Sequence, residues 1–377
     1  MTKRNWGIDC LRGMSILLVM LNHLGLGFRL PLKQSVLIDY VPLRVLSALS
    51  FNGYESVFIF FVISGFLIAS KALSQHANLQ ALDWRTFYVR RASRILPLLL
   101  ALLGVLTLLH LAGFADYRIQ EPGQSLGGAL LSALGLYLNW YEGQTTWLPA
   151  SWDVLWSLSI EEVFYLAFPL VCLLLPRKML LIGLALLALS LPFTKAALQG
   201  NEIWSEKAYL PGMSAIAIGV LAAFVAQQWT HQSSRTARMF LVLGLAGVLG
   251  TLLWGDFIWR SIAHDNMLVL TLGVAAWLLA CHYLCKQAHA PRGLGWLAHM
   301  GQLSYEIYIS HMFVVLSTVA LFRHFYAPNL RWDFVVYIPC IALCVWIGKA
   351  LQRWLTLPCE RYFRRANPRE SRRHAVS

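Results

Sequence analysis

The chain has 377 residues, of which 58% are hydrophobic and only 13% are charged, and the hydrophobic residues fall in long blocks. This pattern excludes an ordinary soluble domain, whose single core would give alternating or amphipathic patterns instead of continuous apolar runs. The formal net charge of +13 does not indicate nucleic-acid binding, because most basic residues lie between apolar blocks, where they orient membrane spans.

Eleven apolar segments follow one another along the chain. They cover about 8–28, 53–72, 95–113, 126–140, 153–175, 179–195, 209–228, 237–255, 264–286, 300–322 and 332–357. Such runs predict transmembrane helices, because only a helix satisfies its own backbone hydrogen bonds in lipid. The segment 126–140 is short and contains Gly127, Gly128 and Gly135. We therefore interpret it as a re-entrant or interfacial segment.

The basic residues support this count of spans. With ten spans, 19 of the 31 lysines and arginines lie on the side of the two termini and 9 lie on the other side. This bias predicts that both termini are cytoplasmic. The predicted fold class is all-α: a polytopic membrane protein with about ten transmembrane helices and one short re-entrant or interfacial segment. Residues 1–360 would form one membrane domain, and residues 361–377 a basic cytoplasmic tail.

The seven cysteines do not indicate a metal site. Cys281 and Cys285 are one helical turn apart, as are Cys340 and Cys344, but neither pair has neighbouring His or Asp residues at the spacing of metal ligands. We interpret the cysteines as small buried hydrophobic residues and expect no metal.

The first span contains two ionisable residues, Arg12 and His23, whose burial in lipid is energetically unfavourable. A charged group within a span costs about 2.5–3.5 kcal/mol, so such residues are candidates for function. Their spacing places them within roughly 20° on one helix face and about 16 Å apart. The alternatives are that Arg12 reaches the headgroups and that His23 makes an interhelical hydrogen bond.

A second polar set opens the segment from 153. Glu161 shares a helix face with Ser157 and Tyr165 and is followed by a second carboxylate, Glu162. We expect Glu161 to reach a depth similar to that of His23, where a carboxylate would orient the imidazole for general-base catalysis. The alternative is a structural polar cluster between helices.

Two further stretches could hold a ligand. Arg91 and Arg94 are neighbours on a helix at the cytoplasmic side and could bind phosphate, although lipid headgroups explain them equally well. Ser64 and Gly65 form a small pair inside the second span, where a thin ligand could approach, although tight helix packing is the commoner reason. His311 ends an unusually polar run that begins at Ser304.

These stretches, in this order, resemble the acyltransferase-3 family of membrane O-acyltransferases. The resemblance covers nearly the whole chain. It comprises Arg12 and His23, the Phe-Phe-x-x-Ser-Gly stretch that ends at Ser64 and Gly65, the Arg-x-x-Arg pair, the Trp-Ser-Leu-x-x-Glu-Glu-x-Phe-Tyr segment and the Ser-Tyr…His run that ends at His311. Glu306 departs from the small polar residue expected there, and the ending around Glu360 matches only loosely.

The resemblance implies transfer of an acetyl or other acyl group from cytoplasmic acetyl-CoA to a hydroxyl of a cell-surface or lipid-linked glycan. His23, Glu161 and His311 would be catalytic, and the donor would bind at the residues Arg12, Arg91, Arg94, Ser64 and Gly65. The expected location is the cytoplasmic (inner) membrane of a bacterium, in contact with membrane lipids and without nucleic acid. Family members often carry a fused extracytoplasmic esterase-like domain that these 377 residues lack, which leaves open a separate extracytoplasmic partner.

The main alternative is a secondary transporter or a flippase of a glycan precursor, in which the same His, Glu and Arg would form a substrate or proton path. A non-catalytic scaffold is a third possibility, in which the buried charges would be an unexplained cost.

Overall fold

The described part of the chain contains helices and no strands. The computed structural model describes residues 5–29, 32–76, 78–229, 233–262, 266–285, 290–326 and 330–365. The long helices are α1 (Trp6–Phe28), α3 (Gly53–Gln75), α4 (Trp84–Leu111), α8 (Leu155–Leu174), α9 (Arg177–Leu189), α12 (Tyr209–Gln228), α13 (Ser234–Ile262), α14 (Asn266–Leu284), α16 (Ser304–Tyr326) and α17 (Tyr337–Leu351). The short ones are α2 (Leu43–Phe51), α5 (Leu126–Leu134), α6 (Leu138–Gln144), α7 (Ala150–Asp153), α10 (Leu191–Ala197), α11 (Glu202–Lys207), α15 (Gly295–Gln302) and α18 (Leu357–Arg365).

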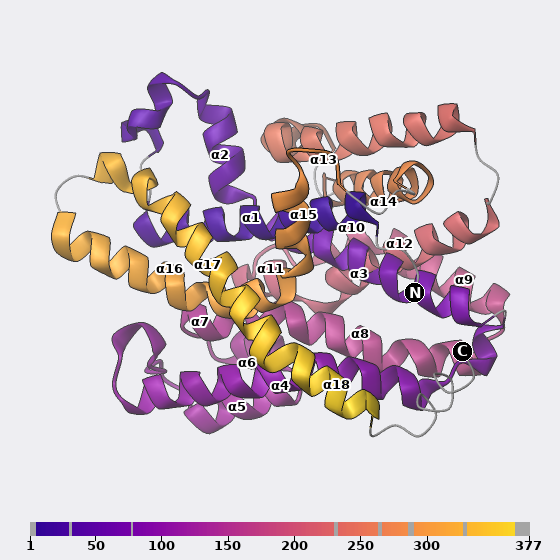
Figure 1. The fold of residues 1–377 in the computed structure, drawn as a ribbon, viewed down its shortest axis with the longest axis horizontal. Coiled ribbons are helices and arrows are strands. Elements are labelled where there is room, and N and C mark those ends of the chain that lie inside the picture. The colour runs from indigo at the N-terminus through magenta and orange to yellow at the C-terminus, as the bar shows by residue number, and fades with distance from the viewer. Residues whose placement is uncertain are drawn as a thin grey trace.

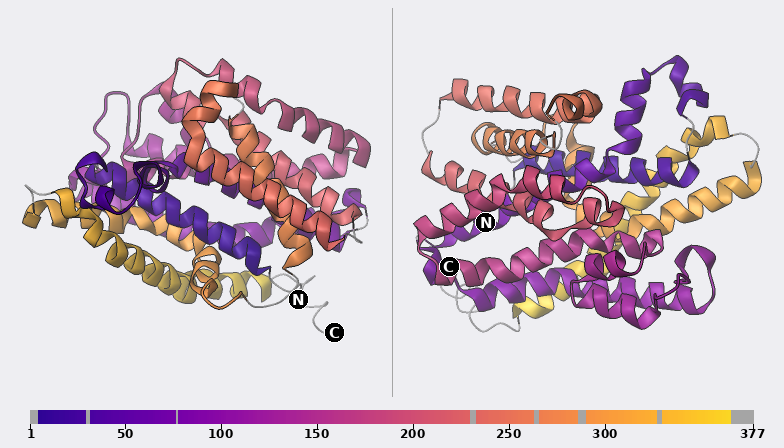
Figure 2. Two further views of the ribbon diagram at one scale, coloured as in Figure 1. Left: turned by 90° about the horizontal axis from the view of Figure 1, so that it is seen from above. Right: turned by 180° about the vertical axis from the view of Figure 1, so that it is seen from behind.

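The long helices form a membrane-spanning bundle (Figure 1, Figure 2). Among the described residues, nine helical stretches are long and apolar enough to cross a membrane, and α9 with α10 makes a tenth across a 42° bend. The predicted all-α polytopic fold is thereby confirmed. The predicted span 209–228 coincides with α12. The last part of the predicted basic tail, 366–377, lies outside the described residues.

The two ends of the bundle differ in charge. Helix α1 begins and α18 ends on the same side (Figure 1). The helix ends on that side carry Arg85, Arg177 and Arg235. We call it the basic face and the other side the opposite face.

The segment predicted not to cross is folded as two short helices. Helices α5 and α6 have nine and seven residues, so they are about 14 and 11 Å long, against about 30 Å for the hydrocarbon layer. Between them Leu136 adopts the left-handed conformation, with a φ of 60°. Its carbonyl accepts a hydrogen bond of 2.7 Å from the Tyr209 hydroxyl. The segment 126–140 therefore contains no helix long enough to cross the membrane, as predicted, and its re-entrant or interfacial position stays a prediction.

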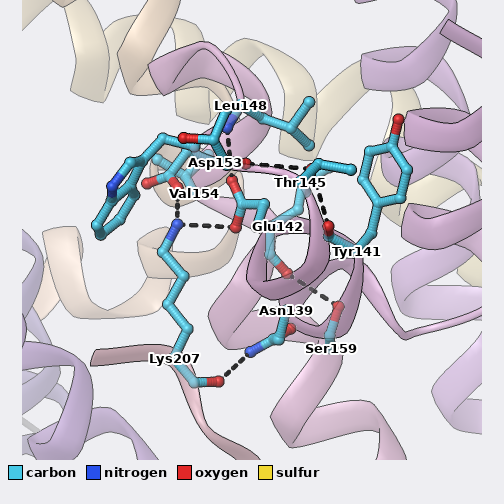
Figure 3. A network of polar contacts seen from close by, with 12 residues as sticks. Asn139, Tyr141, Glu142, Thr145, Leu148, Asp153, Val154, Ser159 and Lys207 are labelled. Atoms are coloured by element: carbon cyan, nitrogen blue, oxygen red, sulfur yellow. Dashed lines mark hydrogen bonds and ion pairs between the residues drawn. The ribbon is translucent and has the colours of Figure 1, made fainter. Parts of the chain in front are cut away.

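A buried ion-pair network anchors this segment (Figure 3). The Lys207 amine lies 2.7 Å from a Glu142 carboxylate oxygen and also bonds Asp153. The same amine lies 4.0 Å from the Trp147 ring centre, and the Asn139 amide donates to the Lys207 carbonyl at 2.6 Å. Because Lys207 is 1% exposed and Glu142 is fully buried, the network ties α6 and α7 to α11. It thereby determines where α8 starts.

Helix α1 is held by close packing against the last third of the chain. A Cβ at Gly301 would collide with the carbonyl oxygen of Asp9, and a Cβ at Gly13 would collide with that of Leu297. This contact belongs to α15, which the predicted span 300–322 did not separate from α16. The break at Leu303 lets α15 pack on the start of α1 while α16 continues along it.

Candidate active site

A cavity of about 480 Å³ follows one face of α3 from Val57 to His76. At 1.5 Å per residue this face is about 28 Å long. The other walls come from α1, α4, α8 and α16, and the end at the basic face includes Lys71 and Glu360. We call it the central cavity. Its polar lining includes Arg12, Ser64, Lys71, Arg90, Arg91, Arg94, Ser157, Glu161, Tyr165, Ser304, Tyr305 and Tyr308.

The two residues of the small pair have different surroundings. Ser64 lines the central cavity, whereas Gly65 does not. A Cβ at Gly65 would collide with the carbonyl oxygen of Ile216 on α12. Gly65 therefore lies in the contact between α3 and α12 and not in the lining of the central cavity, and its role in donor binding stays a prediction.

Arg91 lies at the centre of an ion-pair cluster between α4 and α8. It lies 2.9 Å from Glu161 and 2.7 Å from Glu162, and its guanidinium lies 3.7 Å from the ring centre of Tyr165. The same Glu161 oxygen accepts hydrogen bonds of 2.7 Å from Ser64 and Tyr165. Two carboxylates of α8 thus neutralise Arg91, and these ion pairs connect α4 to α8 at the cavity wall.

The other arginines of the cavity differ in their partners. Arg12 donates a hydrogen bond of 2.7 Å to the Ser304 hydroxyl at the start of α16. Arg94 lines the cavity and, within the described ranges, makes no hydrogen bond or ion pair. Its guanidinium is therefore available to an anionic ligand.

The two predicted histidines lie against each other. The His23 and His311 ring centres are 5.1 Å apart. His311 Nδ1 lies 2.7 Å from the Tyr308 carbonyl oxygen, and because a carbonyl only accepts, Nδ1 must carry the proton. A neutral His311 then keeps its lone pair on Nε2, which is buried and has no hydrogen-bond partner among the residues that the structure describes. An imidazole in this state can act as a general base, because Nε2 can accept a proton from a substrate hydroxyl.

Tyr308 connects this histidine pair to the central cavity. Its hydroxyl donates to the Val154 carbonyl at 2.9 Å and lies 2.7 Å from the Ser157 hydroxyl. Tyr308 and Ser157 both line the inner end of the cavity, whereas the lining includes neither imidazole. The Tyr308 and His311 rings are 5.7 Å apart. Tyr308 therefore separates the cavity from the histidines by one side chain.

The shared face of Arg12 and His23 is confirmed, because both contact α16, at Ser304 and His311. The expectation that Glu161 reaches the depth of His23 is wrong. Contacts with α3 give the depth of each residue. Asn22, next to His23, packs against Gly53 at the start of α3, whereas Glu161 accepts a hydrogen bond from Ser64, in the middle of α3. Eleven residues of helix separate these two levels, a distance of about 16 Å.

The reason lies in where α8 begins. The carbonyl of Val154, which precedes α8, is bonded by Tyr308, only one turn from the first residue of α16. Helix α8 therefore starts deep in the bundle, and Glu161 lies still nearer the basic face. The predicted site residues thus form two groups: Arg91, Glu161 and Ser64 at the cavity wall, and His23 with His311 beyond its inner end.

Sequence reasoning missed Tyr308 as a site residue. A signal was present, because Tyr308 lies three residues before His311 and so on a neighbouring position of the same helix face. The polar run from Ser304 to His311 contains Tyr308, but the pairing of Tyr308 with Ser157 depends on the contact between α8 and α16.

Comparison with known proteins gives a consistent result. The family model described as "Acyltransferase domain" matches residues 5–349. The chain is 24% identical over 331 aligned positions to the O-acetyltransferase OatA of Staphylococcus aureus (strain NCTC 8325 / PS 47), covering 81% of this chain and 52% of the relative. It is also 24% identical over 374 positions to a provisionally named O-acetyltransferase of Staphylococcus aureus (strain COL), covering 93% of this chain and 56% of the relative.

The chain thus spans about half the length of the curated relatives that it matches. No solved structure matches it.

Proposed function

The chain belongs to the acyltransferase-3 family, and from this premise we propose that it is a membrane O-acyltransferase which uses acetyl-CoA as donor and a glycan hydroxyl as acceptor. The observation that carries the proposal is the central cavity, which runs from the arginine-lined basic face to Tyr308, whose ring lies 5.7 Å from that of His311, the partner of His23. We further propose that the basic face is cytoplasmic, in the inner membrane of a bacterium, because basic residues accumulate on that side of spans.

The cavity suits a donor with anionic phosphates and a thin arm. Arg94, with Arg12 and Lys71 in the same lining, supplies positive charge that can bind phosphate oxygens. The lining extends about 28 Å along α3, which accommodates an extended pantetheine arm. The thioester would then lie near Ser157 and Tyr308, at the inner end.

The reaction would proceed at the histidine pair. The acceptor hydroxyl gives its proton to Nε2 of His311, whose lone pair is unpartnered, and its oxygen attacks the thioester carbonyl carbon. A C–O bond forms, the C–S bond breaks, and the departing thiolate of coenzyme A takes the proton from His311. His23 either orients the hydroxyl or accepts the acyl group first and passes it on as an acyl-imidazole.

The test is transfer of radiolabelled acetyl from acetyl-CoA to glycan in membranes that contain matched amounts of parent or variant protein. We expect His23→Ala and His311→Ala each to lower the rate by about 100-fold or more, the usual contribution of general acid–base catalysis. His299→Ala is the control, because His299 is exposed on α15, and its rate should equal that of the parent. Full activity in both histidine variants would refute the catalytic assignment. Glycan uptake into vesicles without acetyl-CoA would instead identify a transporter.

A further inference from the structure

A second cavity, of about 520 Å³, opens on the opposite face. We call it the rim cavity. It lies between α10, α11 and the end of α13, and its lining includes Lys195, Gln199, Asn201, Glu202, Ser205 and Trp259. The floor is anchored, because α11 ends at Lys207, whose amine is tied to Glu142 and Asp153 (Figure 3).

The chemistry of this lining fits a saccharide. Two side-chain amides, a carboxylate, an amine and a hydroxyl offer both donors and acceptors to sugar hydroxyls. One large aromatic ring, Trp259, is 41% exposed and can cover the apolar face of a pyranose. A few polar groups placed around an aromatic surface are typical of small-molecule sites.

The rim cavity lies close to the inner end of the central cavity. Lys195, in its wall, donates a hydrogen bond of 3.0 Å to the Tyr54 hydroxyl. The Tyr54 ring stacks on Trp156 with centres 6.2 Å apart. Trp156 precedes Ser157, and Tyr54 lies one turn before Val57; both Ser157 and Val57 line the central cavity. Trp156 in turn lies 6.2 Å from the ring of Phe61, which lines the central cavity, so an aromatic layer of Tyr54, Trp156 and Phe61 connects the walls of the two cavities.

We propose that the rim cavity binds the acceptor saccharide, with Trp259 stacked on a sugar ring and the surrounding amides on its hydroxyls. The proposal rests on the proposed function, because it assigns that enzyme's second substrate. The donor arm and the sugar then approach the same aromatic layer from opposite faces of the membrane.

The experiment compares Trp259→Ala with Phe257→Ala, a control at an aromatic residue of the same helix that is 69% exposed and does not line the rim cavity. Radiolabelled acetyl-CoA is the donor, and the envelope fraction of the source cells is the acceptor. We expect Trp259→Ala to lower transfer at low acceptor about tenfold, as loss of an aromatic binding residue commonly does. Transfer should recover as envelope material is added. The KM for acetyl-CoA should stay at the parent value, and Phe257→Ala should behave as the parent.

The two proposals fail in different ways. If Trp259→Ala transfers acetyl at the parent rate at low acceptor, or if it changes the KM for acetyl-CoA instead, the rim cavity is not the acceptor site while the proposed function stands. If the parent protein itself transfers no acetyl from acetyl-CoA, the proposed function fails, and this inference fails with it.

Discussion

At the scale of single residues, neighbouring arginines of one motif have different tasks. Arg91 is neutralised by Glu161 and Glu162, whereas Arg94 lines the same cavity without a hydrogen bond among the described residues. A motif of two arginines three residues apart therefore divides into a structural residue and a residue available to ligand. A sequence pattern cannot make this division, because it depends on which carboxylates another helix brings near.

This division predicts the effect of removing Arg94. We expect Arg94→Ala to raise the KM for acetyl-CoA about tenfold with little change in kcat, because a phosphate contact acts equally on the bound donor and the transition state. Steady-state kinetics with acetyl-CoA as the varied substrate measures this. Arg85→Ala is the control, since Arg85 is exposed and lies outside the lining of the central cavity. An unchanged KM in Arg94→Ala would contradict the assignment.

At the scale of elements, glycines set the distance between helices α3 and α12. Gly65 faces the carbonyl oxygen of Ile216, and Gly219 faces that of Val62. These two contacts let the backbones approach closely, as small residues do between membrane helices. Because α3 also forms one wall of the central cavity, the spacing of α3 and α12 determines the position of Ser64.

Substitution at this contact should be costly. Gly65→Ala would place a Cβ against backbone, which cannot move as a flexible side chain can. We expect it to destabilise the fold by about 1–3 kcal/mol and to lower the melting temperature of the detergent-solubilised protein. Gly104→Ala on α4 is the control, because a Cβ there meets nothing within 4 Å. Equal melting temperatures for the two variants would show that α3 and α12 are not in close contact.

At the scale of the whole molecule, the Lys207 network joins the non-crossing segment to the bundle. One amine faces two carboxylates, Glu142 and Asp153. Helix α6, which carries Glu142, is not among the crossing helices. Burial, and after it the Asp153 charge, raises the pKa of Glu142 to about 9, although Lys207 acts in the opposite direction. At pH values between the unfolded and the folded pKa values, the Glu142 carboxyl is therefore protonated in the folded protein and ionised in the unfolded chain.

The sign of the pH dependence follows from this. Because the folded pKa lies above the unfolded value of 4.5, this contribution to stability is fully present below about pH 4.5 and is lost as pH rises through about 9. We expect the melting temperature to fall between pH 5 and 9 by more in the parent than in Glu142→Gln, which keeps the acceptor for the Leu148 amide but cannot ionise. Equal slopes in the two proteins would rule out Glu142 as the titrating group.

The sequence by itself determined the helical class, the non-crossing segment and the shared face of Arg12 and His23. Each of these follows from local rules, namely the length of apolar runs and the 100° step of the helix. Hydropathy also predicted both ends of α12 correctly, because the helix Tyr209–Gln228 has the same bounds as the apolar run 209–228.

Only the tertiary structure decided which residues meet. It paired His23 with His311 and left Glu161 with Arg91, because α8 begins deep in the bundle, where Tyr308 and the Lys207 network hold its start. It also turned Ser64 toward the cavity and Gly65 toward α12. The depth of a residue in the membrane and the residues that it contacts depend on packing between helices far apart in the chain. The periodicity of a single helix does not predict that packing.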